Sequence, residues 1–283
     1  MGNRSIIKKS RQKGGMEIIM NTNTIIVAEN YNNLCEKVVE KICELSRKSI
    51  QENGSFTISL SGGSTPKGVY LLMASELYRN KFNWESIHFF WDDERLVPIS
   101  DANSNYRMVY DTLLAKINIP EANIHAIPVN TNDPSRAAYL YERELISFFN
   151  LLEKEFPCFD LILLGLGIDG HTASLFPQSI NISKKTSQLV TSTTGGEPHL
   201  PRVTLTIPVL NNAKNLMWIV EGASKAQIVR KALKSNIEED DKKDDKKDDK
   251  EDDKEENLLP KHVLLKNGKT FWFLDKDASQ LLS

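Results

Sequence analysis

The sequence has 283 residues, of which 40% are hydrophobic, and this size suits one large globular domain or two small ones. A net charge of −2 conceals two charged segments: residues 1–16 carry five basic side chains and no acid, and residues 238–256 carry thirteen acids and six lysines. The remainder has no net charge, which excludes the broad basic surface of a nucleic-acid-binding protein.

Membrane, export and redox signals bear on location. No apolar run approaches the roughly 20 residues that cross a bilayer, and the first residues lack the apolar stretch of a signal peptide. The three cysteines show no CxxC spacing, which argues against a secreted disulfide framework. We therefore expect a cytoplasmic protein without a membrane partner.

Apolar, β-branched runs alternate with segments of helical periodicity along the first part of the chain. We expect strands at residues 24–28, 56–60, 87–91 and 160–164, and helices at 31–51, 66–78, 103–116 and 134–155. Such alternation is typical of βα units. It predicts a single Rossmann-like α/β domain with a mostly parallel sheet flanked by helices.

The pattern changes in the C-terminal half, where we expect a smaller additional strand region. Strands are expected at residues 188–193, 202–207, 216–220 and 270–274, with a helix at 224–235. We expect residues 1–20 to form a disordered basic tail and residues 21–283 to form a catalytic domain. Residues 238–256 contain no apolar side chain, so they are expected to be a disordered acidic low-complexity insertion within it.

The first motif that carries chemistry is SGGSTP, which begins at Ser61 directly after an expected strand. Gly62 and Gly63 permit close backbone approach, and the proline suits the first turn of a helix. Free N–H groups at a helix N-terminus, beside the hydroxyls of Ser64 and Thr65, would bind an anion. An ordinary turn with one of these hydroxyls as N-cap is the alternative for this motif alone.

The second motif, WDDERLVP, begins at Trp91, where another expected strand ends. Ligands of open α/β sheets gather at the carboxyl ends of strands. Arg95 would hold a phosphate in a bidentate fork, and carboxylates such as that of Asp93 would orient it. A surface loop with salt bridges is the alternative.

The third motif, GLGIDGHTASLFP, begins at Gly165 and contains the dinucleotide-type pattern GxGxxG. The acidic residue expected about twenty positions later in a dinucleotide site is missing. Asp169 and His171, two residues apart after a buried strand, instead suggest a general base and the carboxylate that orients it. A purely structural histidine is the alternative.

The three motifs occur together, in this order and at about this spacing, in the 6-phosphogluconolactonases. The chain resembles that family from about residue 24 to 283 outside the acidic insertion, and its RVTLT and GASK segments are similar to later segments of the family. The resemblance implies hydrolysis of 6-phospho-D-glucono-1,5-lactone to 6-phospho-D-gluconate in the pentose phosphate pathway, with no metal or cofactor.

The resemblance also implies roles for individual residues. His171 would take a proton from the attacking water, and Asp169 would fix the tautomer of its ring. The phosphate and ring oxygens of a sugar-phosphate lactone would be bound by Gly62, Gly63, Ser64, Thr65, Asp93, Arg95, Arg202 and Lys225. We expect a monomer or weak homodimer, and an association with glucose-6-phosphate dehydrogenase.

Two other functions stay open. Glucosamine-6-phosphate deaminases resemble the chain in SGGSTP and DGH but continue DGHIAFNEP, with a catalytic glutamate before the proline. Phe176, which cannot transfer protons, takes that place here, and Asp93-Glu94-Arg95 replaces their Asp-Glu-Tyr. The second alternative is a non-catalytic sugar-phosphate sensor, against which the Asp169–His171 pair argues.

Overall fold

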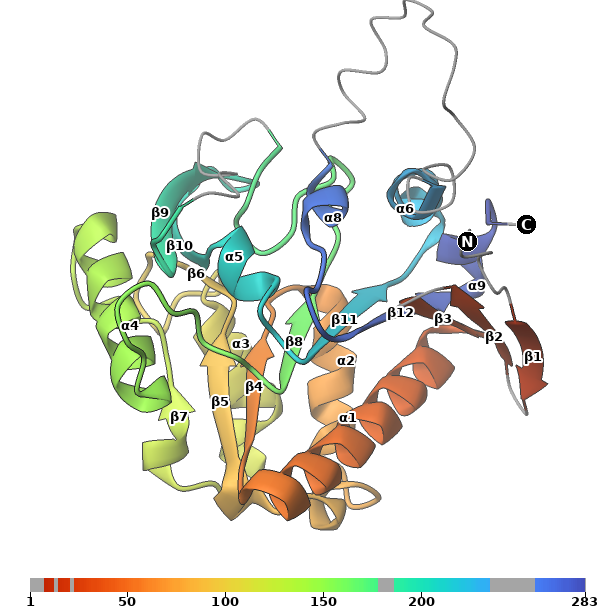
Figure 1. Cartoon of the computed structure of the whole chain (residues 1–283), viewed down its shortest axis with the longest axis horizontal. Coiled ribbons are helices and arrows are strands. Elements are labelled where there is room, and N and C mark those ends of the chain that lie inside the picture. The colour runs from red at the N-terminus through yellow and green to blue at the C-terminus, as the bar shows by residue number, and fades with distance from the viewer. Residues whose placement is uncertain (1–7, 13–14, 21–22, 178–185, 235–257, 283) are drawn as a thin grey trace, which may run out of the picture.

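A nine-stranded sheet forms the centre of the described part of the chain, which comprises residues 8–12, 15–20, 23–177, 186–234 and 258–282 of a computed structural model. Its strand order is β1-β2-β3-β12-β11-β8-β4-β5-β7 (Figure 1). From β3 to β7 in this order the strands are parallel, and β1 and β2 add an antiparallel edge. The bounds are β1 (Lys8–Gln12), β2 (Gly15–Met20), β3 (Asn23–Ala28), β4 (Phe56–Leu60), β5 (Ile87–Trp91), β7 (Ile124–His125), β8 (Leu161–Leu164), β11 (Asn215–Val220) and β12 (Lys269–Asp275).

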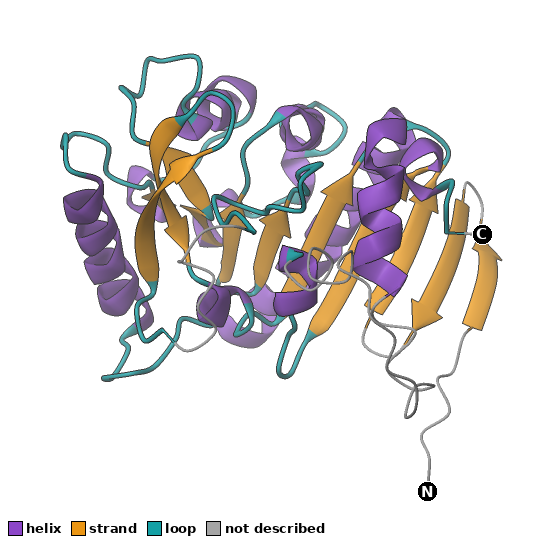
Figure 2. Cartoon of the chain, turned by 90° about the horizontal axis from the view of Figure 1, so that it is seen from above, coloured by secondary structure: helices purple, strands orange, loops and turns teal. Residues whose placement is uncertain are grey.

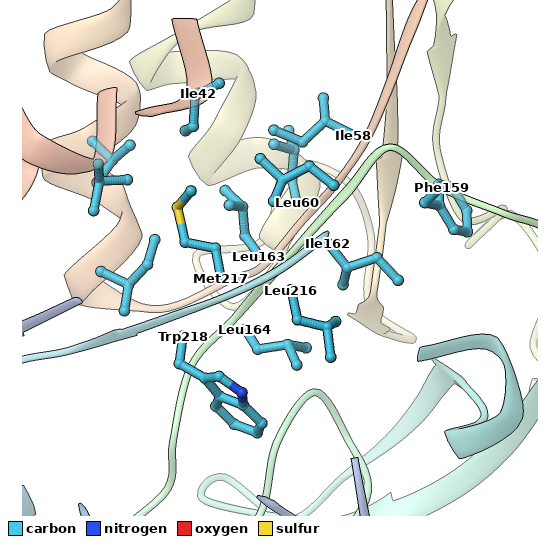
Figure 3. Packing of buried hydrophobic residues seen from close by; sticks show 14 of the residues in the cluster. Ile42, Ile58, Leu60, Phe159, Ile162, Leu163, Leu164, Leu216, Met217 and Trp218 are labelled. Atoms are coloured by element: carbon cyan, nitrogen blue, oxygen red, sulfur yellow. The ribbon is translucent and has the colours of Figure 1, made fainter. Parts of the chain in front are cut away.

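Apolar side chains fill both faces of the central strands, as a parallel sheet covered on both sides requires. Leu163 and Met217 are register partners on β8 and β11, and so are Leu164 and Trp218. Figure 3 shows the first pair on the side of Ile42 and the second pair on the opposite side. All five side chains are buried, so the expected α/β architecture with a mostly parallel sheet is confirmed.

The helices follow the expected order along the chain. The longer ones are α1 (Tyr31–Asn53), α2 (Ser64–Met73), α3 (Asn105–Thr112), α4 (Pro134–Phe149) and α6 (Ala226–Lys234). Short helices are α5 (Ile207–Leu210), α8 (Leu259–His262) and α9 (Lys276–Ser279), and 3₁₀ turns occur at Arg79–Lys81, Trp84–Ser86, Leu114–Lys116, Glu121–Asn123 and Ala223–Lys225. Among the described residues, no helix is both long and apolar enough to cross a membrane.

A second sheet of three antiparallel strands confirms the smaller additional strand region. Its order is β6 (Asp93–Arg95), β10 (Leu200–Leu205) and β9 (Val190–Gly195). Helix α4 lies alongside β9 and β10 (Figures 1 and 2). Asp92 joins the two sheets, because its N–H donates to Leu60 O at 3.0 Å and its carbonyl accepts from Leu205 N at 2.8 Å.

The prediction of a disordered tail over residues 1–20 is wrong for β1 and β2, which pair with each other and, through β2, with β3. The segment is basic up to residue 13, but it ends in Ile18, Ile19 and Met20, and β-branched apolar residues suit a strand. Residues 1–7 and the acidic insertion at 238–256 lie outside the described residues.

Helices α4 and α2 both end earlier than expected. Helix α4 stops at Phe149 because Asn150 adopts the left-handed conformation, with φ of 50° and ψ of 47°. Helix α2 stops at Met73; Ala74 N still donates to Tyr70 O, and the next bond, from Ser75 N to Leu72 O, is of the 3₁₀ type. Neither change moves a residue of the expected site.

Candidate active site

The site lies at the carboxyl edge of the large sheet, where the neighbouring strands β11, β8, β4 and β5 end (Figure 1). Loops leave β4, β8 and β11 at this edge, and β5 passes through Asp92 into β6. All three motifs therefore meet where ligands of open α/β sheets bind.

The SGGSTP segment forms the turn between β4 and α2. Gly63, with φ of 99°, is the N-cap of α2, and no side chain caps this helix. The alternative in which Ser64 or Thr65 serves as N-cap is therefore wrong, and the helix start keeps the N–H groups that suit an anion. Gly62 has no room for a side chain, because the amide of Asn105 occupies the place of a Cβ atom.

Two tyrosine hydroxyls hold this turn. The hydroxyl of Tyr31 donates to Thr65 O at 2.8 Å and accepts from Gly68 N at 3.0 Å. The hydroxyl of Tyr70 donates to Ser61 O at 2.8 Å and accepts from Ser61 N at 3.1 Å. Burial raises the pKa of both phenols, so they stay protonated and keep both roles.

Arg95 and Arg202 are register partners on β6 and β10. Arg202 is buried; its Nε donates to Gly195 O at 2.7 Å, and its Nη1 lies 3.8 Å from Asp93 Oδ2. Burial lowers the pKa of Arg202, but a guanidinium still stays charged. Arg95 is half-buried and donates Nη1 to Asn103 O at 2.7 Å. Two like charges in register repel each other, and a bound phosphate would relieve this repulsion.

The two acids before Arg95 position their neighbours. Asp93 is buried and accepts from Asn105 Nδ2 at 2.8 Å and from the hydroxyl of Ser174. Asp93 also lies close to Arg202, so it can orient this guanidinium as well as Asn105. Glu94 is 2% exposed and accepts from the N–H groups of Asn105 and Tyr106, each at 2.7 Å. Burial raises the pKa of Glu94 to about 6, although these N–H bonds act in the opposite direction.

Asp169 and His171 form a hydrogen-bonded pair on the turn after β8. His171 Nδ1 lies 2.5 Å from Asp169 Oδ1, and the two side chains are 34% and 52% exposed, respectively. The bond from His171 lowers the pKa of Asp169, so the carboxylate stays ionised and Nδ1 holds the proton. Gly167 leaves the necessary space, because a Cβ atom there would overlap the ring and the carboxylate. Gly170 adopts φ of 85° between the two residues.

Lys225 and Glu221 come from the loop after β11. Lys225 Nζ donates to Leu166 O at 2.7 Å. Burial lowers the pKa of Lys225, and Asp169 raises it. The pKa of Glu221 is raised by burial and by Asp275. One Glu221 oxygen is buried with no hydrogen-bond partner among the described residues.

A cavity of about 230 Å³ brings these groups together. Of the ten expected site residues, nine line it: Gly62, Gly63, Ser64, Thr65, Asp93, Arg95, His171, Arg202 and Lys225. Asp169 does not line it but contacts His171. Phe176 lies beside His171, with 5.0 Å between ring centroids, and the Arg202 guanidinium lies 5.9 Å from the Phe176 ring.

A larger cavity of about 770 Å³ lies between α1 and the amino ends of β3, β11 and β12. Charged groups there pair with each other, as in Lys41–Glu44 at 2.5 Å and Lys214–Asp160 at 2.7 Å. The smaller cavity is the better site because it alone of the two holds the histidine and the helix N-terminus. Within the described ranges, no three His, Cys, Asp or Glu side chains could hold a metal ion together.

The sequence reasoning missed Asn105, Ser174 and Glu221. Asn105 contacts both the SGGSTP turn and Asp93, a contact between segments that sequence spacing does not reveal. Ser174 lies inside the third motif, and this position was the only sequence signal for it. Glu221 directly precedes the GASK segment, but an acidic side chain is not expected in a pocket for an anion, so the sequence did not indicate its place.

Together, the fold and the cavity define an α/β protein in which an uncapped helix N-terminus, two arginines, a lysine and a histidine–carboxylate pair lie together. The family described as glucosamine-6-phosphate isomerases/6-phosphogluconolactonase matches residues 29–258. The chain belongs to this family.

Relatives support the same assignment. The 6-phosphogluconolactonase of Synechocystis is 38% identical over 85% of this chain and 91% of its own length. The chloroplastic 6-phosphogluconolactonase 3 of Arabidopsis thaliana is 35% identical over 88% of this chain and 72% of its own. The structure of 6-phosphogluconolactonase from Trypanosoma brucei superposes with a TM-score of 0.75 at 29% identity, covering 92% of this chain and 98% of that one. A monomeric glucosamine-6-phosphate deaminase, at 19% identity and a TM-score of 0.70, shares the fold.

Proposed function

We propose that this protein hydrolyses 6-phospho-D-glucono-1,5-lactone to 6-phospho-D-gluconate in the oxidative pentose phosphate pathway, with His171 as general base. The observation that carries the proposal is that His171, bonded to Asp169 at 2.5 Å, lines the same cavity as the uncapped start of α2 and the cations Arg95, Arg202 and Lys225. The cavity can therefore hold a phosphate at the cations and the start of α2, with the reacting ester beside His171.

The ring of His171 is prepared to take a proton. Because Asp169 holds the proton on Nδ1, Nε2 has a free lone pair toward the cavity. A water molecule attacks the lactone carbonyl carbon and gives a proton to Nε2, forming a tetrahedral intermediate. The bond from that carbon to the ring oxygen then breaks, Nε2 returns the proton to the leaving oxygen, and the new acid ionises in solution. One positioned base contributes roughly 10²–10⁴-fold to such a reaction.

The phosphate binds the positive groups of the cavity. The N–H groups at the start of α2 and the Arg95 guanidinium suit its oxygens. Arg202 is already held by Gly195 and Asp93, so it contributes charge and shapes the wall. Lys225 donates to Leu166 O, and its charge interacts with Asp169, the partner of His171. Lys225 therefore suits an oxygen of the lactone.

Phe176 is the residue that separates this proposal from amino-sugar deamination. Its ring packs against His171 and carries no group that transfers a proton. Purified protein should release acid from freshly generated 6-phosphogluconolactone and no ammonia from glucosamine 6-phosphate. His171→Ala is the matched control, because this variant keeps the groups that would bind the phosphate and lacks the base. Ammonia release at an enzymatic rate would overturn the lactonase assignment, and binding of the lactone without acid release would indicate a sensor.

The remaining expectations are part of the proposal. We propose a cytoplasmic monomer or weak homodimer that associates with glucose-6-phosphate dehydrogenase. The relatives from Arabidopsis thaliana and rice are named chloroplastic, so localisation of the tagged full chain is the direct test of place. No step above uses a metal, and activity should survive dialysis against a chelator; activity that zinc or magnesium restores would contradict this.

A further inference from the structure

The turn that carries the histidine–carboxylate pair, residues 167–171, rests on side chains from distant segments. A Cβ atom on Gly170 would lie 2.5 Å from Leu258 Cδ2 and 3.5 Å from Ile228 Cδ1. Leu259 N donates to Gly170 O at 3.3 Å. Figure 1 shows α8, which begins at Leu259, beside the loop after β8. His171 lines the cavity, whereas Gly170 lies against the apolar side chains of Leu258 and Ile228.

The conformation of the turn depends on this support. Gly170 has φ of 85°, and a glycine loses more backbone freedom than other residues when it is fixed in one conformation. Within the turn, Gly167 N donates to His171 O at 2.8 Å and Gly170 N to Gly167 O at 3.0 Å. The side chains of Asp169 and His171 are partly exposed, whereas Leu258 is 6% exposed. The buried contact is thus on the backbone between the two functional residues.

We infer that Leu258 is a positioning residue, which fixes the peptide of Gly170 and thereby the hydrogen bond between Asp169 and His171. A rotation of the Gly170 backbone would move the carboxylate relative to the ring. The protein groups that would bind the phosphate follow β4 or lie on β6 and β10, so they do not depend on this contact. The kinetic part of the inference rests on the proposed function.

The kinetic test compares Leu258→Ala with Leu145→Ala, which removes the same atoms from a fully buried position on α4. We expect kcat of Leu258→Ala to fall roughly 10- to 100-fold, with KM within about twofold. Leu145→Ala should lose thermal stability and keep kcat. Leu258→Met, which conserves volume, should restore most of kcat. If kcat of Leu258→Ala equals that of Leu145→Ala, or if KM rises while kcat stays, Leu258 does not position the pair.

A measurement without substrate separates this inference from the proposed function. The tautomer of the neutral His171 ring is followed by ¹⁵N NMR at one pH, in the wild type, Asp169→Asn and Leu258→Ala. Loss of the carboxylate in Asp169→Asn should reduce the fraction of rings that hold the proton on Nδ1, and Leu258→Ala should reduce it part of the way. An unchanged tautomer fraction in folded Leu258→Ala would overturn the inference. Absence of lactone hydrolysis by the wild type would overturn the function and leave this comparison valid.

Discussion

The bond between Asp169 and His171 gives the two side chains different roles. The histidine lowers the pKa of Asp169, so the carboxylate stays ionised and holds the ring proton on Nδ1. In the proposed mechanism Nε2 accepts a proton from water. Loss of either side chain should therefore affect kcat more than substrate binding.

His171→Ala should lower kcat by roughly 10²–10⁴-fold, because a general base acts in the transition state. KM should stay almost unchanged, because the protein groups that would bind the phosphate remain. Asp169→Asn should retain more activity, because the base itself remains. Steady-state assays of both variants would measure the two effects. An unchanged kcat in His171→Ala removes this histidine from the mechanism.

Arg95→Ala should raise KM for the phosphorylated lactone far more than for the unphosphorylated one. Arg95 is half-buried and its Nε has no partner among the described residues, so a phosphate would gain a charge-assisted contact in a partly desolvated place. The measurement is KM for 6-phosphogluconolactone and gluconolactone in both proteins. An equal effect on the two lactones would place Arg95 away from the phosphate.

At this scale the sequence predicted which residues meet in one cavity, but not the contacts that support them. Nine expected residues line one cavity because the motifs follow strands that end at one edge. The contacts of Asp93 with Asn105, Ser174 and Arg202 were not predicted. These contacts join segments far apart in the chain, and one sequence contains no signal for them.

Secondary-structure elements add a second level of support, in which α3 fixes the arginine strand β6. Glu94 in β6 accepts from the first N–H groups of α3, and the Ser104 hydroxyl also donates to it at 3.1 Å. An ionised acid at a helix N-terminus is favourable, whereas burial disfavours its charge. Burial outweighs the N–H bonds and raises the pKa of Glu94 to about 6.

Because of this pKa, the free energy of unfolding should depend on pH. Between pH 4.5, the ordinary value of a glutamate, and pH 6, the folded state holds a proton on Glu94 that the unfolded chain has released. The free energy of unfolding therefore falls by about 2 kcal/mol as pH rises through this window, and levels off above it. Glu94→Gln resembles the protonated acid and should lack this fall. Urea unfolding at several pH values is the measurement, and parallel pH curves for the two proteins would contradict the assignment.

Element boundaries were predicted less well than element types. The helix expected at 134–155 ends at Phe149, and its length was overestimated because Asn150 is a weaker signal for a left-handed turn than glycine. The strand β6 was not predicted, because its three residues are all charged and show no alternation of apolar and polar side chains. In contrast, β4 and β5 have the predicted bounds, because each is a short apolar run between polar residues.

On the scale of the whole molecule, we predict that the acidic segment is not needed for activity. Replacing residues 238–256 by a short Gly/Ser bridge, with Leu258 kept, should leave kcat/KM within about twofold. The segment contains no apolar side chain, and long insertions cost little to close. Circular dichroism would establish folding and the lactone assay would establish activity. Loss of activity in a folded deletion variant would make the segment a working part.

The pairing of β3 with β12 has a consequence for how the chain reaches this structure. A strand near the beginning of the sequence lies between β2 and a strand near its end, in register from Asn23↔Thr270 to Ala28↔Asp275. During synthesis β3 must wait for almost the whole chain, and until then the edge of β11 also lacks its partner. Such long-range parallel pairing slows folding and leaves apolar strands exposed to other chains. A chain that stops after Leu265 should therefore aggregate rather than form a smaller active enzyme, although every residue that lines the candidate active-site cavity precedes that point.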